Sequence, residues 1–358
     1  MNEAPSRYDA LESCRGIAAL FVAACHLPVN SHFAPLLPAQ PDYFVDFFFV
    51  LSGFIIAGRY QQPLAEGFGV ARFMLLRIGR LYPLHIAVLA AYLALRLLQA
   101  LAPGLGIAAF SAADPWPVVV AANVLLVQAF VDVANWNGPS WSISVEFWTY
   151  LLFAGGVVLA RRRLLLVLAV LSLAGPIATG ALLANGAEDA MVRCVFGFAV
   201  GALTWNLLKG RTRATNPAIE IGTTLSFFML ASLSSKLGAI VVPFVCAAMI
   251  WCYAGATGVV GRALTHRTLV ALGGLSYSVY MIHAFIALLM RGTAHRLERA
   301  LGADIFTVIE GVPHLGTNPW LGDAWFLLYL AVVVLVSAVT FRRIERPWRA
   351  WFRAKAAR

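Results

Sequence analysis

The sequence predicts an all-α polytopic membrane protein with ten transmembrane helices and one further re-entrant or interfacial segment. Composition is the first reason: apolar residues make up 61% of the chain and charged residues 12%, and the mean hydropathy is +0.79. Soluble domains are roughly half apolar and a quarter charged. The second reason is that apolar stretches of span length recur along the chain, and the third is that basic residues cluster between them.

A window of span length finds eleven apolar segments. In chain order they run at about 10–28, 43–58, 81–101, 117–133, 141–160, 164–184, 190–208, 218–233, 238–255, 269–290 and 323–341. We expect the first segment to be retained as a helix. A cleaved signal peptide would begin with a basic region, whereas Glu3, Asp9 and Glu12 occupy this position.

The positive-inside rule predicts which segments cross the membrane, because basic loops stay in the cytoplasm. If all eleven crossed, every short basic loop from Arg161 onward would lie outside. Treating segment 117–133 as non-crossing restores the rule, and this short segment carries Asn123, Gln128 and Asp132. Ten spans and two cytoplasmic termini result. The basic clusters are Arg59/Arg72/Arg77/Arg80, Arg161/Arg162/Arg163, Lys209/Arg211/Arg213, Arg262/His266/Arg267 and the tail from Arg342 to Arg358.

The net charge of +10 needs no nucleic-acid partner, since it is concentrated in the short loops and tail of one membrane face. The cysteines lie in or beside apolar segments and lack the spacing of a zinc site. We therefore expect neither a disulfide framework nor a bound metal. The five cysteines are Cys14, Cys25, Cys194, Cys246 and Cys252.

Arg15 and His26 are titratable residues inside the first apolar segment, where such side chains are scarce. On a helix they would share one face, because eleven residues at ~100° each make three turns plus ~20°, with roughly 16 Å of rise. Taken singly, the arginine reads as a snorkelling residue and the histidine as a hydrogen-bonded core residue. Their shared face favours a functional site, since ionisable groups within spans are costly.

Two carboxylates lie near the expected outer ends of spans. Asp46 precedes the run Phe-Phe-Phe-Val-Leu-Ser-Gly-Phe and reads either as a helix N-cap or as a site residue. Glu146 lies deeper, about one and a half turns into the fifth segment, on the same helix face as Ser142. Capping does not explain a glutamate at that depth, so Glu146 favours function.

Arg77 and Arg80 close the loop after the second segment, ahead of Pro83 in the first turn of the next span. Arginine suits phosphate recognition because its planar fork binds two oxygens at once, although basic loop residues also serve topology alone. In the tenth segment, Ser276, Tyr280 and His283 fall at i, i+4 and i+7. This polar stripe indicates a lined cavity.

On the ten-span topology these groups separate by depth. Four titratable residues fall in the outer half, and three arginines lie in or near the inner leaflet. A donor site open to the cytoplasm and an acceptor site facing outward would produce this arrangement. The outer group is His26, Asp46, Glu146 and His283, and the inner group is Arg15, Arg77 and Arg80.

Six motifs in this order resemble the acyltransferase family 3 membrane proteins, over about Tyr8 to Pro347. Each motif is weak alone, but the ordered set is specific. Two departures are Gly79 between the paired arginines and an unusual lead-in before Arg15. The motifs are Arg15-x10-His26, Asp46-Phe-Phe-Phe-Val-Leu-Ser-Gly-Phe54, Arg77-x-x-Arg80, Trp141-Ser-Ile-Ser-Val-Glu146, Leu275-Ser-Tyr-Ser-Val-Tyr-Met-Ile-His283 and Glu345-Arg-Pro347.

The resemblance implies a stand-alone membrane domain at 8–347 followed by a basic cytoplasmic tail at 348–358. Family members move acyl groups, usually acetyl, from acyl-CoA to sugar hydroxyls of surface or secreted glycans. We therefore expect acetyl-CoA as co-substrate, no metal, a glycan or other sugar-containing acceptor, and a place in a bacterial inner membrane.

The same resemblance assigns roles to the residues singled out above. His26 is expected to take the acceptor proton or to carry the acyl group, and both routes stay open. Asp46 or Glu146 would orient His26 or the sugar, and Arg15, Arg77 and Arg80 would hold the CoA phosphates. The residues expected to bind substrate are Ser142, Ser144, Tyr277, Tyr280 and His283.

Two other functions fit parts of the pattern. A transporter or exporter could use intramembrane histidine and carboxylates as a proton relay, but the two halves lack a matching pair of interrupted segments. A non-catalytic family member acting as a sensor or scaffold is disfavoured, because Arg15 and His26 are both present.

Overall fold

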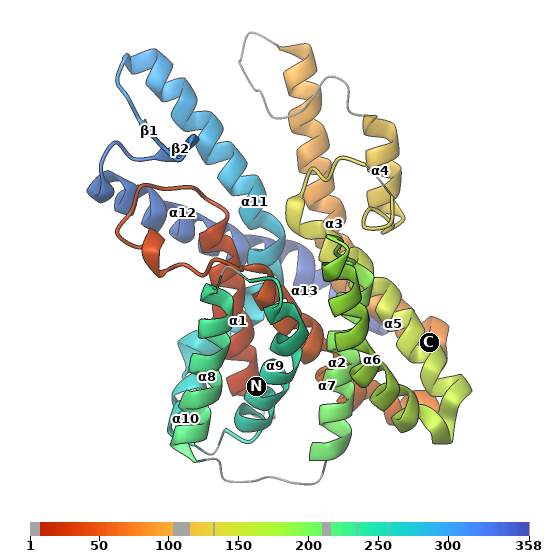
Figure 1. Ribbon diagram of the computed structural model, residues 1–358. Helices are drawn as coiled ribbons and strands as arrows, with labels where there is room; N and C mark the ends of the chain where they lie inside the picture. The colour runs from red at the N-terminus through yellow and green to blue at the C-terminus, as the bar shows by residue number, and fades with distance from the viewer. Residues whose placement is uncertain are drawn as a thin grey trace. The chain divides into compact units, whose positions relative to one another are not determined.

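A computed structural model describes residues 8–102, 115–131, 133–209, 216–233, 235–256 and 258–357 (Figure 1). Glu3, Asp132, Arg211, Arg213 and Arg358 lie outside the described residues. The helices are α1 (Asp9–Cys25), α2 (Asp42–Ala65), α3 (Val70–Leu101), α4 (Trp116–Val124), α5 (Trp141–Ala160), α6 (Leu164–Ala184), α7 (Ala190–Leu208), α8 (Pro217–Ser232), α9 (Gly238–Tyr253), α10 (Val259–Leu264), α11 (Arg267–Leu301), α12 (Pro319–Thr340) and α13 (Arg346–Ala356).

Each of the eleven predicted apolar segments coincides with a helix, which supports the helical membrane character. Within the described residues, six helical stretches are long and apolar enough to cross a bilayer, and α8 and α9 are shorter apolar helices. Helix α4 has nine residues and rises only about 14 Å, against about 30 Å of hydrocarbon. That length suits a non-crossing segment, while the count of ten spans stays a prediction.

The fold is helical as expected, with one short β-hairpin after α11 that the sequence analysis did not predict. Strand β1 (Phe306–Ile309) pairs antiparallel with β2 (Val312–Leu315). The connecting residues Glu310 and Gly311 have φ values of 50° and 79°. Positive φ at both positions belongs to the two-residue hairpin turn that matches the twist of the strands.

The chain divides into two compact units. Unit 1 comprises Met1–Ala18, Pro38–Arg77 and Val145–Ser276, and unit 2 comprises Ala19–Leu37, Ile78–Ser144 and Tyr277–Arg358. Helices α1, α3, α5 and α11 contribute residues to both. Each unit has its own packed interior.

In unit 1, α2 and α7 pack with their backbones in contact. A β-carbon at Gly53 would lie 2.0 Å from the Phe198 carbonyl oxygen, and one at Gly201 would lie 1.8 Å from the Val50 carbonyl oxygen. Small residues let membrane helices approach this closely, so that van der Waals contact holds them without a hydrophobic driving force. The pair therefore forms a rigid base for the side chains near its ends.

In unit 2, the segment after α1 is held by the hairpin and by α12. The Asn30 amide donates to the Leu315 carbonyl at 2.9 Å, and the Leu315 amide donates to the Pro28 carbonyl at 3.0 Å. A β-carbon at Gly322 of α12 would lie 1.7 Å from the Asn30 carbonyl oxygen. The backbone just beyond His26 is thereby fixed.

Unit 2 also explains the polar residues of segment 117–133. His85 contacts the Asn123 carbonyl through Nε2 at 2.9 Å, and Gln128 donates through Nε2 to the Ser140 carbonyl at 2.9 Å. The Ser144 hydroxyl donates to the Leu126 carbonyl at 2.6 Å. The bonds to Asn123 and Leu126 satisfy carbonyl groups where helix α4 ends and irregular backbone begins, and the Gln128 bond ties this segment to the residue before α5.

Candidate active site

Two histidine rings lie together in unit 2. The sequence analysis expected His26 inside the first helix. Helix α1 instead ends at Cys25, so His26 is the first residue beyond it. Its ring packs against that of His283 with centroids 4.6 Å apart and planes at 69°. His26 is exposed, whereas His283 is fully buried. An exposed imidazole thus rests on a buried one.

Hydrogen bonding fixes which nitrogen of each ring carries the proton. The Nδ1 atom of His26 lies 2.7 Å from the Val22 carbonyl oxygen, and Nδ1 of His283 lies 3.1 Å from the Val279 carbonyl oxygen. A carbonyl only accepts, so each neutral ring must donate from Nδ1 and keep an unprotonated Nε2. Nε2 of His283 is buried and lacks a hydrogen-bond partner among the described residues. In the neutral state both rings therefore carry an unprotonated Nε2.

Two further side chains extend the histidine pair. The hydroxyls of Ser142 and Tyr280 lie 2.7 Å apart, and each lies 3.0 Å from the Pro139 carbonyl oxygen. Two hydroxyl protons serve these three contacts, so the pair has two interchangeable proton arrangements. The Tyr280 and His283 rings lie 5.9 Å apart. Tyr280 and His283 of the predicted stripe thus join Ser142 and His26 in one cluster. The third stripe residue, Ser276, instead contacts Arg15 in unit 1.

Tyr329 of α12 also belongs to this cluster, and sequence reasoning missed it. Its buried hydroxyl lies within donating distance of the Ala23 carbonyl at 3.1 Å and of the His283 carbonyl at 3.2 Å. It therefore ties the end of α1 to α11 beside both histidines. The available signal was a tyrosine in the middle of the apolar segment 323–341.

Arg80 lies in a second set of unit 2, centred on the buried carboxylate of Glu345. Its guanidinium is 3.8 Å from Glu345 and 5.6 Å from the centre of the Tyr277 ring. Glu345 also accepts from Ser278 and Arg349. The Tyr277 hydroxyl donates to the Leu81 carbonyl, so its proton is engaged with the backbone.

Arg15 belongs to unit 1 and joins α1 to α11. Its Nε donates to the Ser276 hydroxyl at 2.7 Å, and Nη2 donates to the Gly273 carbonyl at 3.1 Å and lies 2.8 Å from Glu12. Because His26 falls in unit 2, a common site for Arg15 and His26 stays a prediction.

Asp46 forms an ion pair with Arg193 of α7. Its carboxylate accepts from Nη2 at 2.9 Å and from Nε at 3.3 Å, and both side chains are at least nine-tenths buried. The N-cap explanation does not apply, since α2 begins at Asp42 and Asp46 lies in its second turn. Sequence reasoning missed Arg193. The signal was an arginine at the end of a span that the charge rule assigns to the outer side.

Glu146 and Arg77 flank Tyr150 in unit 1. The Tyr150 hydroxyl donates to Glu146 at 2.6 Å and lies 2.8 Å from the Ser52 hydroxyl. Arg77 donates to the Tyr60 hydroxyl at 3.0 Å, and its guanidinium lies 4.8 Å from the Tyr60 ring centre and 5.7 Å from that of Tyr150. Arginine over aromatic faces is a stable arrangement that keeps the planar group oriented.

The predicted residues thus gather into several sets. Unit 2 brings His26, His283, Tyr280 and Ser142 together, whereas Arg80 and Tyr277 lie near Glu345 and Ser144 bonds to segment 117–133. Unit 1 holds Arg15, Asp46 and the Glu146–Arg77 set with separate partners. Across the described ranges, no three His, Cys, Asp or Glu side chains are grouped as metal ligands would be.

Comparison with known proteins places the chain in a family. A family model described as an acyltransferase domain matches residues 8–309. The acyltransferase MdmB of Streptomyces mycarofaciens is 30% identical over 170 residues, 44% of this chain and 41% of that protein. Protein 2 of the picA locus of Rhizobium radiobacter is 41% identical over 87 residues, 24% of this chain and 44% of that protein.

Each match therefore spans less than half the length of the relative, and no solved structure matches. The family model, in contrast, begins at Tyr8 and continues to Ile309, through all but the last of the six motifs found in the sequence. The expectation drawn from those motifs is confirmed: the chain belongs to acyltransferase family 3.

Proposed function

We propose that the protein is a membrane O-acyltransferase that moves an acyl group, acetyl in the first instance, from acyl-CoA to a hydroxyl of a sugar-containing acceptor. The observation that carries this proposal is the unprotonated Nε2 of the exposed His26, held by the Val22 carbonyl on one side and the His283 ring on the other. Membership of an acyltransferase family favours this function over the transporter alternative.

The chemistry follows from a neutral imidazole beside an acceptor hydroxyl. Nε2 of His26 takes the hydroxyl proton as the oxygen attacks the thioester carbonyl. The carbon–sulfur bond then breaks, and the CoA thiolate takes the proton back from the imidazolium. In the covalent variant, Nε2 attacks the thioester carbonyl, the carbon–sulfur bond breaks and CoA leaves as the thiolate; the sugar oxygen then attacks the acyl-imidazolium, the carbon–nitrogen bond breaks, and the hydroxyl proton passes to the CoA thiolate. Either route needs the lone pair that the Val22 contact leaves on Nε2.

The neighbouring groups have supporting roles in this proposal. His283 holds the plane of the His26 ring, and the Ser142–Tyr280 hydroxyl pair donates to or accepts from the sugar by changing its proton arrangement. Ser144 and Tyr277 would contribute through the backbone that their hydroxyls hold.

The charged residues are proposed to position the two substrates. Arg15, Arg77 and Arg80 would hold the CoA phosphates on the cytoplasmic side of a bacterial inner membrane. Asp46 and Glu146 would orient the sugar or the base. Their partners are Arg193 and Tyr150, so each would act through a pair that is already formed.

The test is transfer of labelled acetyl from acetyl-CoA to a panel of free mono- and disaccharides by the purified protein in liposomes. We expect His26→Ala to abolish transfer while the protein still inserts and accumulates. His314→Ala is the matched control, because His314 is half-buried and also contacts a backbone carbonyl through Nδ1, at 2.8 Å. Transfer by His26→Ala at the rate of the His314→Ala control would refute the proposal.

A further inference from the structure

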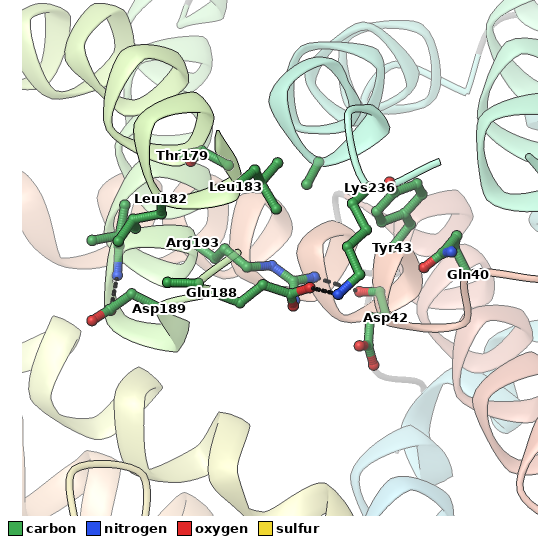
Figure 2. Close-up of a pocket in the computed structure, with 13 residues that line it drawn as sticks. Gln40, Asp42, Tyr43, Thr179, Leu182, Leu183, Glu188, Asp189, Arg193 and Lys236 are labelled. Atoms are coloured by element: carbon green, nitrogen blue, oxygen red, sulfur yellow. Dashed lines mark hydrogen bonds and ion pairs between the residues drawn. The ribbon is translucent and has the colours of Figure 1, made fainter. Parts of the chain in front are cut away.

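Unit 1 contains a cavity of about 250 Å³ at the ends of four helices. It is lined by the start of α2, the end of α6, the start of α7 and the start of α9 (Figure 2). On the predicted topology all four ends face outward, away from the cytoplasmic donor. The volume is below the 300–1,000 Å³ of sites that enclose a drug-sized ligand, so it suits one small moiety.

The charges of this cavity are already paired with one another. Figure 2 shows the Glu188 carboxylate between Arg193 and Lys236. Lys236 Nζ lies 2.6 Å from Glu188, and Arg193 Nη1 lies 3.8 Å from it while Nη2 holds Asp46. Three lining carboxylates (Asp42, Glu188 and Asp189) and two lining cations leave one net negative charge.

This charge balance selects the class of ligand. A phosphate would face a net negative wall and would have to displace carboxylates from Arg193. A neutral polyol meets no such opposition, since carboxylate oxygens in ion pairs keep lone pairs that accept from further hydroxyls. The side chains of Leu182 and Leu183 add an apolar wall of the kind on which the C–H face of a sugar ring can pack.

One buried hydroxyl in the cavity wall lacks a hydrogen-bond partner among the described residues. Thr179 lines the cavity, is 4% exposed, and its Oγ1 makes no hydrogen bond within the described part of the chain. Elsewhere in α6, the Ser172 hydroxyl donates to the carbonyl four residues earlier, at 2.8 Å. Thr179 lacks this usual bond, and a buried polar group without a partner is costly. A ligand hydroxyl in the cavity would satisfy it.

We propose that this cavity binds one neutral, hydroxyl-rich ring of the acceptor, as a sugar subsite separate from the histidine cluster. The inference rests on the proposed function for the identity of the ligand as acceptor. The cavity would hold the acceptor through this ring and would select uncharged sugars there.

Two substitutions test the subsite. Thr179→Val removes the hydroxyl at nearly constant shape, and we expect acceptor KM to rise roughly three- to tenfold with kcat, the KM for acetyl-CoA and Tm maintained. Ala187→Trp fills the cavity and should raise acceptor KM at least as much. Ala184→Trp is the matched control, since Ala184 is exposed nearby on α6 and does not line the cavity.

A binding measurement keeps this test separate from the proposed function. Saturation-transfer NMR with the same free saccharides should show a stronger contact signal in wild type and Ala184→Trp than in Ala187→Trp, where only the histidine cluster is left to bind them. If no saccharide is acylated and this binding pattern still holds, the proposed function fails and the subsite stands. If saccharides are acylated with an acceptor KM unchanged in Thr179→Val and Ala187→Trp, the subsite is wrong and the function stands.

Discussion

The Asp46–Arg193 ion pair allows a quantitative prediction about unit 1. The side chains are 3% and 10% exposed, and two hydrogen bonds join them. Removing one member of such a pair leaves an uncompensated buried charge and costs about 3–5 kcal/mol. We expect Arg193→Met to fall near the upper limit, because its loss leaves the Asp46 carboxylate without the only cation that contacts it in the described residues. Asp46→Asn should fall near the lower limit, because Glu188 lies 3.8 Å from Arg193.

The double variant Asp46→Asn/Arg193→Met completes the cycle. Because neither charge remains buried, we expect it to be more stable than either single variant, which corresponds to a coupling energy of at least about 5 kcal/mol. The measurement is equilibrium unfolding of the purified protein in mixed micelles with increasing SDS, followed by tryptophan fluorescence. Additive losses, or a smaller loss for Arg193→Met than for Asp46→Asn, would show that the pair is not held as described.

Acyl transfer measured on the same proteins separates packing from chemistry. If the double variant is stable and keeps the wild-type kcat, the role of Asp46 is only structural, namely to join α2 and α7. A stable double variant with lost kcat would keep Asp46 as a positioning residue.

Three further predictions concern the donor, the topology and the helix contacts. Replacing Arg77 and Arg80 together with Gln should weaken acetyl-CoA binding by about 3 kcal/mol or more, measured by calorimetry, and an unchanged affinity would leave these arginines a topology role only. In a cysteine-free background in intact cells, an impermeant maleimide should label cysteine at the exposed Gly138 but not at Arg162, and the reverse pattern would rule out ten spans. Gly201→Leu should destabilise unit 1 by at least about 2 kcal/mol in the SDS titration, because the backbone it meets cannot move aside. Gly222→Leu, at the exposed glycine of α8, should lower the stability far less. Equal losses for the two variants would contradict the close crossing of α2 and α7.

Local spacing predicted the parts of the structure that depend on one helix. The apolar segments became helices because hydropathy over span length is a local property. Tyr280 and His283 share a face because residues three apart on a helix are neighbours, which is also a local property. In unit 2 these two residues contact Ser142 and His26.

The partners of the charged residues were beyond the sequence, because they depend on which helices pack together. In the sequence, Arg193 resembles an ordinary arginine at a helix end. Its pairing with Asp46 depends on the packing of α7 against α2. Glu345 was a motif residue to which the sequence analysis assigned no role. In the structure its carboxylate contacts Ser278, Arg80 and Arg349. The hairpin at Glu310 was missed because its strands are four residues long and follow a 35-residue helix.

The long sequence separation of the Asp46–Arg193 pair has a consequence for how the chain is made. The two residues are 147 positions apart, so at about 5–20 residues per second the ribosome needs roughly 7–30 s to add Arg193 after Asp46. During this interval α2 carries a carboxylate whose partner does not yet exist. Asp46 lies one turn from the start of α2, near enough to the end of the helix for water to reach it. Helix α2 is therefore inserted before the α2–α7 contact can form. The charge of Asp46 is paired only when α7 packs against α2.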